Sequence, residues 1–244
     1  MCTLVLRLAP GEKWPLLVGA NRDEMVDRPF DPPAAHWPER PDVVGGRDRL
    51  AGGTWLAVNA ACVVAGVLNR PGALGPEAGK RSRGVLPLIA LDHRTAEGAA
   101  AALRALDAAA WRPFNLVVAD RRHAFFCRGI GGARAAVVPL VPGVHMVTAH
   151  DPDDETSPRI ARHLPRFRAA PPPGPPDWSS WTDLLADDAP PREAAIAIRP
   201  IGGFATTSSA LVAIGQKPVF LFANGFPGDV SYAPVVLHAP EIVT

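Results

Sequence analysis

The sequence lacks the features that would place the chain in a membrane or on nucleic acid. No run of about 18 or more apolar residues occurs, so no transmembrane helix is expected. The 25 basic and 24 acidic residues give a net charge of +1, which supplies no attraction to nucleic acid or an anionic membrane. Arg7, Glu12 and Lys13 interrupt the first apolar stretch too early for a signal peptide. A cytoplasmic location is therefore the expectation.

Cysteine is also scarce. The three cysteines, Cys2, Cys62 and Cys127, form no CxxC pair, so neither a disulfide framework nor a metal site is predicted. Cys62 and Cys127 lie in apolar segments typical of buried strands. The glycine pairs at 45–46 and 52–53 fit no phosphate-binding loop, so no nucleotide cofactor is predicted. These absences leave Cys2 as the cysteine whose position predicts chemistry.

The composition is that of a folded protein, with 48% hydrophobic and 20% charged residues in a chain of 244. Short apolar runs separated by turn residues predict β-hairpins in the first and last parts of the chain. Between them, helices are predicted over 85–91, after Thr95, from Pro158 and within 178–187.

The first residues carry the strongest chemical signal. Initiator methionine is normally removed before a small residue, so Cys2 is expected to become the mature N-terminus. Such a cysteine combines a thiol of pKa about 8.5 with an α-amine of pKa about 7.7–8.0. The amine can then act as the base that activates the thiol as a nucleophile.

Polar residues follow the second predicted strand directly. Thr3–Leu8 and residues 15–20 predict a hairpin with Cys2 at its open end, and Asn21-Arg22-Asp23-Glu24 come next. In an antiparallel pair these residues lie near Cys2, where Asp23 could orient the terminal amine. A solvated loop is the alternative, and the sequence leaves both open.

Three other polar segments remain. Two of them allow two interpretations each, and the third allows one. Asn69 ends an apolar run before Pro71-Gly72, so it either caps a turn or donates to an oxyanion. Arg81 and Arg83 form either a solvated helix entrance or an anion site. The arginines of the helix from Pro158 are expected to face solvent.

Several motifs, taken in order, resemble those of the NRDE family, also called the transport-and-Golgi-organisation family. They are Met1-Cys2-Thr3, Gly19-Ala20-Asn21-Arg22-Asp23-Glu24, Gly45-Gly46-Arg47-Asp48, Gly53-Thr54-Trp55-Leu56, Leu68-Asn69-Arg70 and Arg81-Ser82-Arg83-Gly84. The resemblance is strong over about the first 95 residues and weaker at 115–120 and in the final hairpin. Within these motifs the expected binding residues are Asn21, Arg22, Arg47, Trp55, Arg81 and Arg83.

The family in turn resembles N-terminal-nucleophile hydrolases of the choloylglycine hydrolase and penicillin V acylase kind. The resemblance implies an α+β fold, a four-layer αββα sandwich of two antiparallel sheets, formed by residues 1–244 as one domain. It further implies Cys2 as nucleophile, Asp23 as the residue that holds the amine, and Asn69 as an oxyanion donor.

The sequence departs from those hydrolases at three positions. Ala20 stands where they have an arginine, and no late arginine matches near Thr207-Ser208. Thr148-Ala149-His150 replaces their Thr-Asn pair, which makes His150 a candidate substitute donor. The fold and the nucleophile therefore carry over, whereas activity on bile salts or penicillins does not.

Three functions fit these observations. The first is a cysteine hydrolase that cleaves an amide or thioester bond of a small substrate. The second is a non-enzymatic protein that binds and traffics haem, a lipid or acyl-CoA, as has been connected with the family. No cofactor is predicted, and haem enters only as a ligand of that alternative, with Cys2, His36, His150 or His163 as its candidate ligands. The third keeps the fold but makes the site vestigial. The sequence does not predict the oligomeric state.

Overall fold

Two antiparallel β-sheets face each other in the computed structural model, which describes residues 2–237. The six-stranded sheet has the order β10-β1-β2-β11-β12-β13, with bounds Gly143–Val147, Thr3–Leu8, Leu16–Met25, Phe204–Ile214, Val219–Ala223 and Ala233–Pro234. The seven-stranded sheet runs from β3 to β9 in chain order, with bounds Phe30–Ala34, Val43–Asp48, Leu56–Asn59, Val64–Asn69, Phe114–Ala119, Ala124–Gly129 and Ala136–Leu140.

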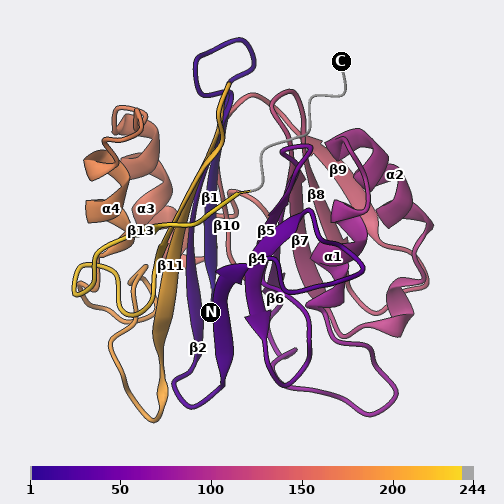
Figure 1. Ribbon diagram of the computed structural model, residues 1–244. Helices are drawn as coiled ribbons and strands as arrows, with labels where there is room; N and C mark the ends of the chain where they lie inside the picture. The colour runs from indigo at the N-terminus through magenta and orange to yellow at the C-terminus, as the bar shows by residue number, and fades with distance from the viewer. Residues whose placement is uncertain (1, 238–244) are drawn as a thin grey trace.

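Helices cover the outer face of each sheet (Figure 1). Helices α1 (Val85–Leu91) and α2 (Ala96–Ala105), followed by the short 3-10 helix Ala108–Ala110, pack on the seven-stranded sheet. Helices α3 (Pro158–Ala169) and α4 (Ser179–Leu185) pack on the six-stranded sheet. The predicted αββα sandwich is therefore confirmed.

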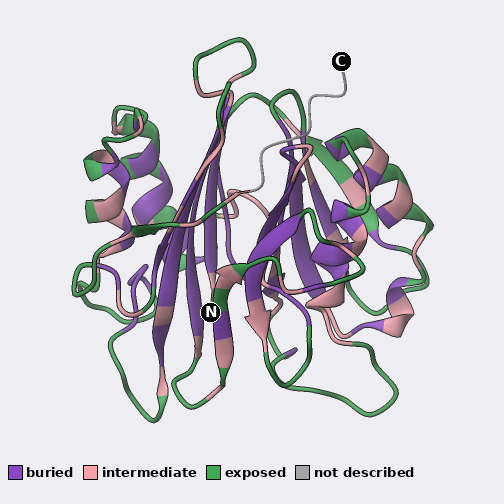
Figure 2. Ribbon diagram, viewed as in Figure 1, coloured by how far each residue is buried: buried purple, intermediate pink, exposed green. Residues whose placement is uncertain are grey.

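Strict alternation along the strands builds three apolar layers. In β1, Leu4, Leu6 and Leu8 pack between the sheets, whereas Val5 faces α3 and α4. On the other sheet Phe114 and Leu116 face α1 and α2. Figure 2 shows the result, with buried residues along both sheets and exposed residues on the outer sides of the helices. None of the helices in residues 2–237 is long and apolar enough to cross a membrane.

The N-terminal hairpin forms as predicted, but its second strand is longer than expected. β1 and β2 pair antiparallel from Leu8 opposite Leu16 to Thr3 opposite Asn21. The polar residues from Asn21 onward continue β2 to Met25, so the alternative of a solvated loop is wrong. The strand can bury Arg22 and Asp23 because each finds polar partners, which removes the cost of burial.

Residues 29–41 are rich in proline and contain the edge strand β3. β3 pairs only with β4 within residues 2–237, and its register is irregular between Asp31 and Ala34, where Pro32 and Pro33 lie. An edge position tolerates prolines because the outward side of the strand needs no N–H donor.

The prediction of residues 1–244 as one domain includes Met1 and residues 238–244, which lie outside the described residues. The predicted removal of Met1 lies outside them as well.

Candidate active site

Cys2 lies at the open end of the β1–β2 hairpin and packs against the apolar layer between the two sheets. Its Sγ donates a hydrogen bond to the main-chain oxygen of Asp23 across 3.5 Å. Burial raises the pKa of the Cys2 thiol above its ordinary value, and the nearby charge of Asp23 acts in the same direction. Arg22 opposes this rise. The thiol therefore needs a base to become a nucleophile near neutral pH.

The carboxylate of Asp23 points to the opposite face of β2, toward α3. Its side chain is 0% exposed, and its Oδ1 accepts a hydrogen bond from Thr206 Oγ1 at 2.6 Å. Its Oδ2 accepts from Arg159 Nη1 at 3.1 Å, and the same nitrogen donates to Thr3 Oγ1 at 2.8 Å. One arginine thus binds the residue that follows Cys2 and the carboxylate predicted to hold the amine.

The expectation that the α3 arginines face solvent is wrong for Arg159. Its side chain is 7% exposed because it lies on the same helix stripe as Ile160, His163 and Phe167, which face the sheet. The helical spacing of Arg159 from His163 and Phe167 was the signal for its burial. Arg166 and Arg168, by contrast, are close to half exposed.

Thr206 was also missed as a site residue. Its Oγ1 accepts from the Ile198 N–H at 2.7 Å and donates to Asp23, so it has a partner on each side. A register shift between Thr206 and Ser208 forms a β-bulge beside Asp23. Thr206 therefore fixes the orientation of the Asp23 carboxylate.

Arg22 shares the inter-sheet face with Cys2. Its guanidinium carbon lies 4.6 Å from the centroid of the Trp55 ring and 5.1 Å from that of Phe30. It also donates to Thr207 Oγ1 at 2.9 Å. Burial lowers the pKa of Arg22, while Cys2 and Glu24 act in the opposite direction. Of the predicted binding residues, Arg22 and Trp55 thus contact each other beside Cys2.

Asn21 is fully engaged within the fold. Its Nδ2 donates to the main-chain oxygens of Leu185 at 2.8 Å and Ile196 at 3.0 Å, and its Oδ1 accepts from Ser209 Oγ at 2.7 Å. These bonds connect β2 to the end of α4 and to β11. Asn21 therefore supports the strand that carries Arg22 and Asp23.

Asn69 ends β6 near the same end of the sandwich. Alternation gives its side chain the same face as Ala65 and Val67, toward α1 and α2. The N–H of Val67 donates to Trp55 O at 2.9 Å. Main-chain N–H groups two residues apart on a strand point the same way, so the N–H of Asn69 also points to the β5 side. It lies beyond the end of β5, whose pairing with β6 ends at Leu56 and Gly66.

Arg70 and Asn115 hold this end of the sheets together. Arg70 Nη1 donates to Asn115 Oδ1 and Asp151 Oδ1, both at 2.6 Å. Asn115 Nδ2 donates to Thr148 O at 3.0 Å and His150 O at 2.7 Å. Since β10 ends at Val147 beside Leu4 of β1, Asn115 connects the two sheets near Cys2.

The predicted anion site at Arg81 and Arg83 divides into two separate positions. Arg83 Nη1 donates to the main-chain oxygens of Ala73 and Pro113. Burial lowers the pKa of Arg83, followed by the charge of Arg112, while Cys2 and Glu24 act in the opposite direction. Arg81 is exposed, and its guanidinium carbon lies 4.7 Å from the centroid of the Trp111 ring. Its contacts are therefore separate from those of Arg83.

Arg47 belongs to a charge cluster on β3 and β4. Its Nε donates to Asp31 Oδ2 at 2.8 Å, and Arg49 Nε donates to Oδ1 at 2.5 Å. These two bonds lower the pKa of Asp31. Arg47 therefore pairs its own strand with the neighbouring edge strand.

His150 lines a cavity of about 360 Å³ beside α3, with Thr148, Arg159, Arg192 and Glu193. Its Nδ1 is buried and has no hydrogen-bond partner among residues 2–237. The same cavity thus contacts Arg159, which connects it to Asp23.

Two of the candidate haem ligands, His36 and His163, have hydrogen-bond partners within the fold. His36 Nε2 bonds to Pro32 O at 2.7 Å, and His163 Nε2 bonds to Ala194 O at 2.9 Å. Within the described part of the chain, no group of three or more His, Cys, Asp or Glu side chains is placed to hold a metal ion.

Three solved structures of similar architecture are hydrolases by name. The N-acylethanolamine-hydrolyzing acid amidase ortholog of Caenorhabditis elegans matches with a TM-score of 0.59 and 13% identity, over 86% of this chain and 92% of that chain. A mutant conjugated bile acid hydrolase from Clostridium perfringens matches with a TM-score of 0.55 and 11% identity, over 96% and 92%. A second variant of that hydrolase matches with a TM-score of 0.54 and 11% identity, over 97% of this chain and 98% of that chain. At these identities the likeness establishes the fold alone.

Sequence comparison is more specific. No curated protein sequence matches the chain. The family model described as Transport and Golgi organisation 2 matches residues 1–171, which is more than half of the chain and includes every candidate residue from Cys2 to Arg159. The chain belongs to the Transport and Golgi organisation 2 family.

Proposed function

We propose that this protein is an N-terminal cysteine hydrolase that cleaves an amide or thioester bond of a small substrate after removal of Met1. One observation carries the proposal. The Cys2 thiol lies beside Arg22 on the inter-sheet face, while the buried Asp23 carboxylate is fixed on the other face of the same strand end by Arg159 and Thr206.

The proposed reaction has two steps. The raised pKa of the Cys2 thiol keeps the thiol protonated near pH 7, so the reaction needs a base. The α-amine of mature Cys2 is that base and accepts the thiol proton. Sγ then attacks the carbonyl carbon, and the amine or thiol leaving group departs with that proton. Water cleaves the acyl–sulfur bond, releases a carboxylic acid and restores the thiol.

The surrounding groups have distinct roles in the proposal. Asp23 orients the α-amine, and Arg159 positions Asp23 relative to Thr3. The main-chain N–H of Asn69, which lies on the β5 side beyond the ladder, is the proposed oxyanion donor. Its side chain points toward the helix layer and takes no part.

Turnover of a panel of amides and thioesters by the wild type and Cys2→Ala tests the proposal. We expect Cys2→Ala to abolish turnover without unfolding the protein. Cys127→Ala is the matched control, since burial raises the pKa of that thiol to about 12 and keeps it unreactive. Turnover that survives in Cys2→Ala would reject the mechanism, and ligand binding without any turnover would favour the non-enzymatic alternative.

A further inference from the structure

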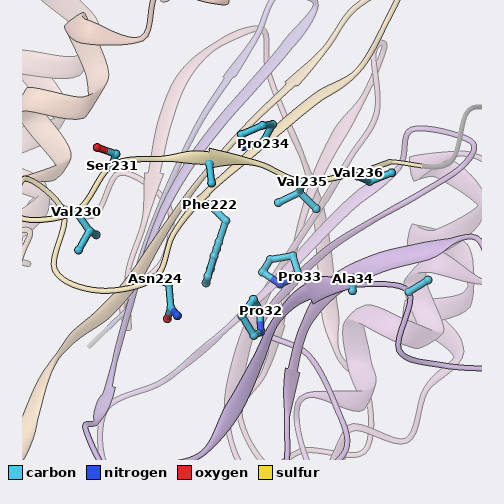
Figure 3. Close-up of a pocket in the computed structure, with 12 residues that line it drawn as sticks. Pro32, Pro33, Ala34, Phe222, Asn224, Val230, Ser231, Pro234, Val235 and Val236 are labelled. Carbon is cyan, nitrogen blue, oxygen red and sulfur yellow. The ribbon is translucent and has the colours of Figure 1, made fainter.

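A second cavity, a groove of about 590 Å³, lies between β3 and the β12–β13 hairpin (Figure 3). Phe222 and Val235 project from the hairpin side toward Pro32 and Pro33 on the opposite wall. This volume is within the range of about 300–1,000 Å³ that small-molecule sites occupy.

The walls of this groove are apolar. Pro32 and Pro33 have no main-chain N–H, so this part of β3 presents no donor that a ligand would have to satisfy. Asn224 and Ser231 are the polar side chains that line the groove. Such a site suits a ligand that is mostly aliphatic and carries its polar group at one end.

Aromatic contacts connect the groove to the surroundings of Cys2. The ring centroids of Phe222 and Phe30 are 6.4 Å apart, and Phe30 also contacts Trp55 and Arg22. The Phe30 ring therefore separates the groove from Arg22 by one layer of side chains.

The register of the six-stranded sheet forms a polar row from Cys2 to the groove. Arg22 pairs with Ser208, while Cys2 and Asn224 lie one residue beyond the pairs Thr3–Asn21 and Ser209–Ala223. The row Cys2, Arg22, Ser208, Asn224 thus crosses four strands on the inter-sheet face. Three steps of about 4.8 Å make it about 14 Å long.

Ser208 occupies this row without a hydrogen-bond partner. The residue is 1% exposed, and its Oγ has no hydrogen-bond partner within residues 2–237. A buried hydroxyl without a partner carries an energetic cost in the folded protein.

We propose that the groove binds the aliphatic chain of a long-chain acyl substrate, with its amide or thioester carbonyl directed along the row toward Cys2. Rotation of the Phe30 ring then opens the way between groove and thiol, and the methylene groups of the chain pass Ser208. This proposal rests on the proposed function, because it names the substrate class of the same site.

A chain-length series of acyl amides, from acetyl to palmitoyl, tests the proposal. Each buried methylene strengthens binding by about fourfold, so kcat/KM should rise with chain length until the groove is filled. Val235→Trp fills the groove from one wall and Ala34→Trp from the other. Both should lower the palmitoyl-to-acetyl ratio of kcat/KM by about tenfold or more. Val138→Trp, on exposed β9 outside the groove, is the matched control and should keep the wild-type ratio.

Ser208→Ala should leave the unfolding midpoint unchanged or higher, because it removes a buried hydroxyl that has no partner within residues 2–237. A palmitoyl-to-acetyl ratio that stays at the wild-type value in both tryptophan variants would overturn the groove proposal, even if Cys2-dependent turnover persists.

A calorimetric titration separates the two proposals. Hexadecanamide should bind Cys2→Ala, and Val235→Trp introduced into that variant should remove the binding. If the wild type cleaves no member of the series, the proposed function fails, and the titration then decides the groove by itself. Equal binding by both variants means that the chain occupies another surface, which rejects the groove.

Discussion

Arg159 Nη1 donates to both Asp23 Oδ2, at 3.1 Å, and Thr3 Oγ1, at 2.8 Å. The contact joins α3 to the two strands that carry the candidate site, since Thr3 follows Cys2 and the main-chain oxygen of Asp23 accepts from Cys2 Sγ. With exposed fractions of 7% and 0%, the two side chains form a buried ion pair.

Arg159→Leu removes the guanidinium from this buried carboxylate. Breaking a buried pair from one side costs about 3–5 kcal/mol, so the free energy of unfolding in urea should fall by that amount. Arg168→Leu is the control, because its ion pair with Asp153 is partly exposed and should contribute less than about 1 kcal/mol. Equal losses in the two variants would mean that the pair does not hold the site end of β2.

Cys2 should react slowly with iodoacetamide at neutral pH. Only the thiolate reacts, and burial raises the pKa of this thiol, so the rate should still be increasing with pH through the neutral range. Arg22→Leu removes a charge that lowers this pKa and should slow the reaction further at a given pH. Arg28→Leu is the matched control and should leave the rate unchanged. A plateau near pH 7 in the wild type would contradict the described environment.

Gly46→Ala should displace Trp55 and loosen its contact with Arg22. A Cβ at Gly46 would lie 2.2 Å from the Trp55 ring, closer than any real contact. Overpacking of this kind costs about 1–3 kcal/mol, measurable as a lower unfolding midpoint together with a shift of tryptophan fluorescence. Gly132→Ala, where the added Cβ meets nothing within 4 Å, should change neither. Wild-type fluorescence in Gly46→Ala would show that Trp55 is not fixed by Gly46.

His145 should make stability depend on pH. Its Nδ1 bonds to Asp153 Oδ2 at 2.7 Å and its Nε2 to Val141 O at 2.8 Å, and these bonds raise the pKa of His145 above 6.5, against the effects of burial and of Arg168. Since the folded pKa is the higher one, the stabilisation is complete below pH 6.5 and is lost as the pH rises through the folded pKa. His145→Gln should therefore destabilise the protein more below pH 6.5 than at alkaline pH. A difference in unfolding free energy that is the same at both would contradict this.

Local patterns were sufficient to predict much of the fold. The hairpins, α1 over 85–91 and the helix capped by Thr95 form as predicted, because each depends on alternation, helical spacing or a cap within a few residues. The assembly into four layers came from the resemblance to known hydrolases, since no short pattern specifies which sheet faces which.

The site was harder to predict, because its contacts join distant segments. Cys2 and Asp23 were selected from one hairpin, where they lie 21 residues apart. Arg159 and Thr206 reach Asp23 from 136 and 183 residues away, and no local pattern encodes such contacts. Asn21, Arg47 and Arg81 were grouped with the site by motif, yet each has its partners elsewhere in the fold.

The central claim is that mature Cys2 is the nucleophile, and intact-mass and peptide mapping after reaction with a β-lactone test it most directly. We predict a chain that begins at Cys2 and carries one intact lactone as an acyl adduct on that residue, with Cys62 and Cys127 unmodified and no adduct in Cys2→Ala. A chain that retains Met1, or adducts spread over the three cysteines, would contradict the account.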